Sequence, residues 1–126
     1  MATSDGHDYL VRASSTATFG RVVLSARAQH VVVDGPVQNG CPGEAITPAE
    51  LFLGGVASCA VELLQVLARE KGAALSGVEA EMSGSVDRAH EVRSDVTVFN
   101  SVTLRFALSG VSGEDAAALV EGFKAR

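Results

Sequence analysis

The sequence is poor in the residues that build stacking sites, disulfide frameworks and nucleic-acid interfaces. Its 126 residues contain no tryptophan and one tyrosine, so we expect no aromatic stacking site. Two cysteines are too few for a disulfide scaffold, and without an export signal we expect both to be free thiols. No run of basic residues occurs and the net charge is −5, which argues against nucleic acid as a partner.

Signals for export, membrane insertion and metal binding are lacking as well. The opening MATSDGHDYLVR has no apolar signal segment, which favours the cytoplasm. The most apolar run, residues 51–68, is interrupted by Glu62 and Gln65 and therefore predicts a core helix, not a membrane span. The three histidines are isolated, without the spacing of metal ligands. We accordingly expect a soluble protein without metal or cofactor, whose ligands are small neutral or apolar molecules.

The composition that is present fits one globular domain. Hydrophobic residues make up 47% of the chain and charged residues 20%, a balance typical of folded proteins. The length suits one domain with a modest core. Because no repeat or linker interrupts the chain, we assign residues 1–126 to a single domain, with the polar residues 1–7 disordered.

Residues 47–72 carry the strongest helix signal in the chain. Thr47 is a helix-capping residue, Pro48 suits the first helical position, and Glu50 completes a capping box. Gly72 follows two basic side chains in the last turn, as is usual where a helix ends. These signals predict one long helix.

The first half of this helix has no charge between Leu51 and Val61 and is apolar on every face. We therefore expect the helix to be buried nearly all round. The adjacent Gly54 and Gly55 each cost a helix roughly 1 kcal/mol against alanine, which suggests that another backbone approaches closely. A second copy of the same helix would fit this position, so we predict a homodimer with the helix near its two-fold axis.

Strands are predicted on both sides of the helix. Runs of β-branched residues and alternating patterns indicate five of them, at residues 9–14, 16–25, 26–33, 78–88 and 95–108. Turns are expected at residues 34–36 and 90–94, a Gly/Pro loop at 38–46 and a bulge at Asn100. A short amphipathic helix is expected to begin after Ser112. The order of three strands, helix, two strands and helix predicts an α+β domain.

The helix sequence TPAELFLGGVASCAVELLQVLAREKG resembles the central helix of the OsmC/Ohr proteins, which begins with Pro-x-Glu-Leu and carries Ala-x-Cys after small residues. The upstream TATFGR resembles the segment that holds the family's active-site arginine. The likeness covers residues 9–123. It implies an OsmC-like fold, in which antiparallel sheets pack on a long buried central helix of an intertwined homodimer.

The resemblance also implies a thiol peroxidase that reduces organic hydroperoxides in oxidative stress defence. Cys59 would be the peroxidatic thiolate, Arg21 would hold it ionised, and Glu50 would orient the arginine. A dihydrolipoyl protein or another thiol would be the reductant. The family's resolving cysteine lies on or near the second long helix, whereas no cysteine follows Cys59 here and the other thiol, Cys41, precedes the helix.

Each of these residues also has a structural interpretation. Cys59 would be a small core residue, since free cysteine is often buried. Glu50 would be a capping residue only, and Arg21 a solvated strand arginine, with Arg27 as the competing active-site arginine. Cys41 would be a surface loop thiol or a displaced resolving cysteine.

Helix geometry restricts how these groups could meet. Cys59 lies about eleven residues past the helix start, beyond the reach of the helix dipole, so its activation requires a cation. It is also about 13–14 Å along an ideal helix from Glu50, and on the opposite side. Three arrangements could bring the groups into one site. Arg21 could bridge the gap, the glycines could distort the helix, or the partner subunit could supply one of the groups. The nearby Glu62 would raise the pKa of the thiol and oppose its activation.

Two further hypotheses compete with the peroxidase. The alternative function is that of a non-enzymatic OsmC-like dimer, which binds a small apolar ligand and keeps Cys59 in its core. The chain would otherwise be a truncated or degenerate copy with part of its sheet uncovered. If the protein is a peroxidase, an apolar pocket lined by helix residues such as Phe52 and Val56 would favour alkyl hydroperoxides over hydrogen peroxide.

Overall fold

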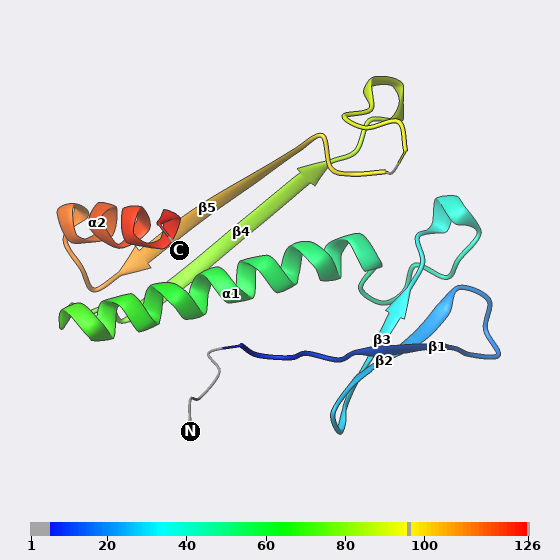
Figure 1. Ribbon diagram of the computed structural model, residues 1–126, viewed down its shortest axis with the longest axis horizontal. Coiled ribbons are helices and arrows are strands. Elements are labelled where there is room, and N and C mark those ends of the chain that lie inside the picture. Colours follow the sequence, from blue (N-terminus) through cyan, green and yellow to red (C-terminus); the bar gives the residue numbers. More distant parts are fainter. Residues whose placement is uncertain (1–5, 96, 126) are drawn as a thin grey trace. The chain divides into compact units, whose positions relative to one another are not determined.

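The computed structural model of the chain describes residues 6–95 and 97–125 (Figure 1). Three strands, a long helix, two strands and a second helix follow one another, so the predicted α+β order is confirmed. The chain divides into two compact units, residues 1–51 and 52–126. The predictions made for residues 1–5 and for Val96 lie outside the described residues.

The first unit is built on an antiparallel sheet with the strand order β1–β2–β3. Its strands are β1 (Arg12–Ser15), β2 (Arg21–Ala26) and β3 (Gln29–Asp34). The register of the β2–β3 hairpin pairs Arg21 with Asp34. The first residue of β2 therefore lies across from the last residue of β3.

The predicted bounds of the second and third strands are wrong at both ends of β2. Residues 16–20 form a loop, in which the Thr16 hydroxyl donates to the Arg21 carbonyl oxygen over 3.0 Å and accepts from the Thr18 amide over 3.2 Å. The hairpin then turns at Arg27, which has a φ of 55°. A non-glycine residue rarely adopts this left-handed conformation, so no local pattern predicts a turn at Arg27.

The second unit contains a two-stranded antiparallel sheet and the helix α2. Strand β4 (Gly77–Ser85) pairs with β5 (Ser101–Ser109), and α2 runs over Gly113–Lys124. The Ser112 hydroxyl accepts a hydrogen bond from the Asp115 amide over 3.1 Å, which confirms the predicted cap. Figure 1 shows the two strands of this sheet as long, adjacent arrows.

The core of the second unit joins its two helices to its sheet. Four buried residues form one apolar cluster, which consists of Leu64, Leu67, Ala68 and Leu119. Phe106 of β5 and Phe123 of α2 pack edge to face beside it, with ring centroids 5.5 Å apart. Apolar burial therefore holds α1, α2 and β5 together.

The connection between β4 and β5 differs from its prediction. The predicted strand 95–108 begins only at Ser101, and Asn100 is not at a bulge. Its Oδ1 accepts from the Asp87 amide over 2.7 Å, and its Nδ2 donates to the His90 carbonyl oxygen over 2.6 Å. Asn100 thus closes the loop, which includes a 3-10 turn over Arg88–His90.

Helix α1 (Pro48–Lys71) has the bounds that its caps predict, but not the predicted burial. Its buried residues all lie in the second half, at Ala60, Leu64, Leu67 and Ala68. In the first half, Phe52 is 62% exposed and Val56 is 39% exposed. The prediction of nearly complete burial is therefore wrong for the single chain, because periodicity does not tell which apolar residues their own chain covers.

The paired glycines of α1 are open in the described part of the chain. Outside the helix's own turns, no described atom lies within 4 Å of the position that a Cβ would take at Gly54 or Gly55. The close backbone approach expected from these glycines thus remains a prediction for a second copy of the chain.

Candidate active site

The first unit fixes Arg21 through a buried carboxylate. Arg21 Nε donates to Asp34 Oδ1 over 2.8 Å, and Arg21 Nη2 donates to Asp34 Oδ2 over 2.9 Å. The Asp34 side chain is fully buried, whereas that of Arg21 is 32% exposed. Two parallel bonds from a planar guanidinium to one carboxylate set its orientation as well as its distance.

Asp34 also joins its strand to the loop that leads to α1. Its Oδ2 accepts hydrogen bonds from the amides of Glu44 and Ala45 over 2.9 and 3.0 Å. The hydrogen bonds from Arg21, together with these amides, lower the pKa of Asp34 to about 2 against the cost of burial. Asp34 is therefore an ionised hub that links β2, β3 and the loop.

The sequence prediction missed this role of Asp34. Asp34 was assigned to a turn with the next two residues, whereas it is the last residue of β3. The sequence does contain a signal for this role, because Asp34 directly follows the apolar run Val31–Val33. A carboxylate buried at such a position needs a charged or hydrogen-bonding partner. The partner could be named only from the hairpin register.

Glu44 is a second and weaker partner of the same guanidinium. Arg21 Nη2 lies 3.3 Å from Glu44 Oε1, and the Glu44 side chain is 76% exposed. The hydrogen bonds that Arg21 donates to Asp34, more than any other contact, raise the pKa of Arg21 further above its ordinary value. Arg21 is thus permanently charged, with one buried partner and one exposed partner.

Glu50 is engaged at the start of α1. Its Oε1 accepts from the Thr47 amide over 2.9 Å and from the Thr47 hydroxyl over 2.8 Å, which lowers its pKa. The predicted capping box is confirmed. Within the described residues, the carboxylates that contact Arg21 are those of Asp34 and Glu44. The role of Glu50 in orienting the arginine therefore stays a prediction.

Arg27, the competing arginine, lies in the hairpin turn at the other end of β2 from Arg21. Six residues of a strand span roughly 20 Å, so the two arginines serve different places. Arg27 is exposed in its turn. Of the two arginines, Arg21 is the one whose guanidinium is held by a buried carboxylate.

Cys59 lies in the second unit as a free and exposed thiol of α1. The interpretation of Cys59 as a core residue is not supported by the single chain, where it is exposed. Phe52, Val56 and Cys59 are spaced four and three residues apart and therefore share one helix face. The thiol is consequently part of the apolar surface that the first half of α1 leaves open.

Cys41 is also free, but it is half-buried and not the surface thiol that we expected. A Cβ at either Gly20 or Gly35 would overlap its sulfur. The amide of Gly35 donates to the carbonyl oxygen of Gly20 over 2.8 Å, so these backbones form a tight seat for the thiol. The seat adjoins Arg21 and Asp34 in sequence, and a resolving role for Cys41 stays a prediction.

The model of the family described as OsmC-like protein matches residues 41–126 of this chain. The chain belongs to the OsmC-like family. Glu50 and Cys59 lie inside the matched range, whereas Arg21 and Asp34 precede it. No curated protein matches the OsmC-like chain.

Solved structures share the OsmC-like fold along nearly the whole chain. An OsmC-like protein from Mycoplasma pneumoniae is 15% identical with a TM-score of 0.79, over 95% of this chain and 82% of that one. An organic hydroperoxide resistance protein OsmC from Legionella pneumophila is 21% identical with a TM-score of 0.69, over 93% and 82%. One from Elizabethkingia anophelis is 14% identical with a TM-score of 0.74, over 96% and 84%. The predicted OsmC-like α+β fold is confirmed.

The long helix fits this fold as its central helix. By length and composition alone, α1 would also suffice to cross a membrane, and 22% of its most apolar window is buried. The central helix of a soluble-type fold passes the same test, and the family match includes all of α1. The core helix predicted from the sequence is therefore the assignment that the fold supports.

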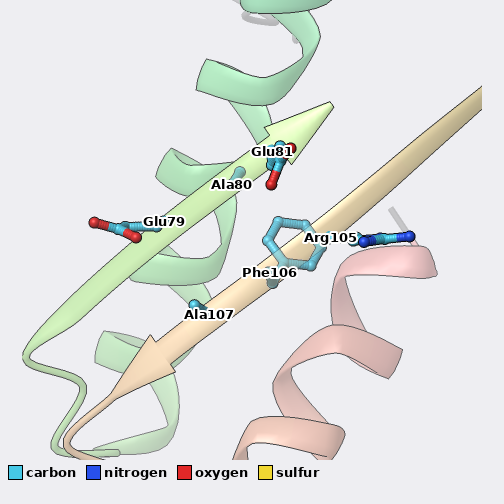
Figure 2. A pocket seen from close by; sticks show the side chains of 6 residues that line it. All are labelled: Glu79, Ala80, Glu81, Arg105, Phe106 and Ala107. Atoms are coloured by element: carbon cyan, nitrogen blue, oxygen red, sulfur yellow. The ribbon is translucent and has the colours of Figure 1, made fainter. Parts of the chain in front are cut away.

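A hollow of about 390 Å³ lies on the β4–β5 hairpin. Figure 2 shows its lining, with Glu79 pointing away from Arg105. The lining consists of Glu79, Ala80, Glu81, Arg105, Phe106 and Ala107. It contains neither a thiol nor a predicted site residue.

Over residues 6–95 and 97–125, no group of three histidine, cysteine or acidic side chains could hold a metal ion.

Proposed function

We propose that this OsmC-like protein is a thiol peroxidase that reduces organic hydroperoxides through Cys59. Family membership, together with relatives named as organic hydroperoxide resistance proteins, supports a role in peroxide stress. The observation that carries the proposal is the free thiol of Cys59, exposed on an apolar helix face. Such a face suits an alkyl hydroperoxide better than the small and polar hydrogen peroxide.

The reaction begins with the thiolate of Cys59. Its sulfur attacks the terminal oxygen of the hydroperoxide, the O–O bond breaks, and the alkoxide takes up a proton to leave as an alcohol. Cys59 is oxidised to a sulfenic acid while the peroxide is reduced. A dithiol, such as a dihydrolipoyl protein, or another thiol then forms a mixed disulfide with release of water. A second thiol frees Cys59.

The proposal gives Arg21 the task of keeping this thiol ionised. Cys59 is the twelfth residue of α1, too far from the helix start for the dipole to act on it. Arg21 is permanently charged and held in one orientation by Asp34. We propose that the guanidinium meets the sulfur in the assembled protein, and that Arg21, not Arg27, has this role.

A homodimer in the cytoplasm completes the proposal. The exposed apolar residues Phe52 and Val56, and the open positions of Gly54 and Gly55, leave room for a second copy along α1. Two unpaired cysteines suit the reducing cytoplasm.

The experiment is the consumption of cumene hydroperoxide by the reduced protein with dihydrolipoamide present. We expect fast turnover, its loss in Cys59→Ser and its retention in Cys41→Ser. A parent protein no faster than free cysteine would refute the peroxidase, as would full activity of Cys59→Ser. Loss of turnover in Cys41→Ser would make the half-buried thiol the resolving group.

A non-enzymatic dimer that binds a small apolar ligand is the second candidate function. A hollow of about 480 Å³ between β5 and α2 favours it, because four of its five lining residues are apolar. The lining consists of Leu104, Phe106, Val120, Phe123 and Lys124. Binding of an apolar dye that Val120→Arg abolishes, in a protein without peroxidase activity, would support this function.

A further inference from the structure

The Arg21 guanidinium has three nitrogen atoms, and the structure uses them unequally. Nε and Nη2 form the edge that faces Asp34, and Nη2 also reaches Glu44. Nη1 donates to none of the residues that the structure describes. The side-on pair with Asp34 therefore fixes the plane of the guanidinium and leaves one nitrogen with both of its N–H groups available.

Asp34 and Glu50 differ in how firmly their own surroundings hold them. Asp34 is built into the end of β3, where its amide donates to the Ile46 carbonyl oxygen over 3.0 Å and its side chain accepts four hydrogen bonds. In Glu50, by contrast, Oε1 accepts hydrogen bonds from both the amide and the hydroxyl of Thr47. A carboxylate fixed in a strand holds a partner more firmly than one that caps an exposed helix end.

We propose that Asp34 is the residue that positions Arg21, so that the free Nη1 edge faces the thiolate and the peroxide. The proposal rests on the proposed function, and it gives Glu50 a structural role at the start of α1. Asp34 touches neither substrate nor sulfur in this scheme, because it acts only through Arg21. A guanidinium fixed on one edge would need little reorganisation when the reaction begins.

Removing Asp34 has two opposite effects on the Cys59 thiol. The negative charge of Asp34 partly cancels the field of Arg21, so its loss alone would favour the thiolate form of Cys59. Loss of the positioning would move the guanidinium away and disfavour the thiolate. The direction of the change therefore separates a positioning role from a simple charge effect.

The test compares Asp34→Asn with Glu50→Gln, which both exchange a carboxylate for an amide of similar shape. A Cys41→Ser background leaves Cys59 as the one thiol. We measure kcat/KM for cumene hydroperoxide and the pH profile of Cys59 alkylation by iodoacetamide. Misplacing a group by about 1 Å can cost about 100-fold, so we expect Asp34→Asn to lower kcat/KM at least tenfold. We expect its alkylation midpoint to move to higher pH, and Glu50→Gln to stay near the parent.

An Arg21→Ala background shows whether Asp34 acts through the arginine. In that background Asp34→Asn should cause no further loss of kcat/KM. An equal loss with and without Arg21 would make Asp34 merely structural and overturn the proposal. A shift of the alkylation midpoint to lower pH in Asp34→Asn would overturn it as well.

The Nε–H signal of Arg21 in nitrogen-15 NMR tests the positioning without any peroxide. We expect a signal protected from exchange with water in the parent and in Glu50→Gln. If Asp34→Asn fails to fold, Glu50→Gln still decides, because loss of the signal in that variant would overturn the proposal. A protected signal in a protein without peroxidase activity would refute the proposed function alone.

Discussion

The two units of this OsmC-like chain are stabilised internally by different kinds of interaction. Around Asp34, the first unit buries a carboxylate with four hydrogen-bond donors. Among the described residues of the second unit, the buried side chains are apolar and centre on Leu64 and Leu119. The two units therefore have different roles. The first, polar unit fixes the orientation of Arg21, and the second, apolar unit carries the exposed thiol of Cys59 on α1.

Leu64→Ala tests the apolar unit and should have the largest effect on stability. The side chain is fully buried between α1 and α2, and truncation leaves a cavity. We expect the free energy of unfolding in urea to fall by about 2–5 kcal/mol. Leu63→Ala, at a half-buried position of the same helix, should cost less. Equal losses would contradict the assignment of this core.

Acid tests the polar unit. The pKa of Asp34 in the folded protein is about 2, below the value of about 3.9 for an unperturbed aspartate. The stabilisation by ionised Asp34 is therefore complete above about pH 4, and it is lost as the pH falls towards 2. We expect the NMR signals of the Glu44 and Ala45 amides to change in that range.

Asp34→Asn is the control for the acid experiment, because it removes the titrating group. Its Glu44 and Ala45 amide signals should not change between pH 4 and 2. Earlier changes among core residues of the second unit, such as Leu119, would show that acid acts elsewhere first.

Gly35→Ala tests how tightly Cys41 is seated in the polar unit. The new methyl group would overlap the Cys41 sulfur, so we expect a loss of about 1–3 kcal/mol in thermal or urea unfolding. Cys41→Ala should recover part of this loss in the double variant. Gly113→Ala is the matched control, because outside its chain neighbours and its own helix turn no described atom lies within 4 Å of a Cβ there. An unaffected Gly35→Ala protein would contradict the seat.

Glu44→Gln should have the smallest effect. Its pair with Arg21 is long and its side chain is exposed, so we expect less than about 0.5 kcal/mol in stability. Because Asp34 alone would still hold the guanidinium, the Arg21 Nε–H signal should survive. A larger loss, or a lost signal, would show that the exposed carboxylate shares the anchoring.

Elements with local end signals could be predicted from the sequence. The caps at Thr47 and Ser112 predicted the helix starts, and the alternation along residues 78–88 predicted strand β4. The hairpin turn at Arg27 could not be predicted, because its left-handed backbone is imposed by the pairing of β2 with β3.

The candidate site was predictable only in part. Cys59 and the capping role of Glu50 followed from the helix itself. The partner of Arg21 depends on the register of two strands, which no local pattern sets. The exposure of the helix face that carries Cys59 depends on whether other parts of the same chain pack on it. Hydrophobic periodicity shows that a face is apolar but not what covers it.

The ion pair of Arg21 and Asp34 also has a consequence for how the sheet assembles. The facing stretches of β2 and β3 contain consecutive valines, Val22–Val23 and Val31–Val33, so their apolar pattern accepts more than one alignment. A slip by one residue would place Arg21 opposite valine and leave a carboxylate at the strand end without its partner. The pair therefore favours the native register of the hairpin over alignments that are shifted by one residue.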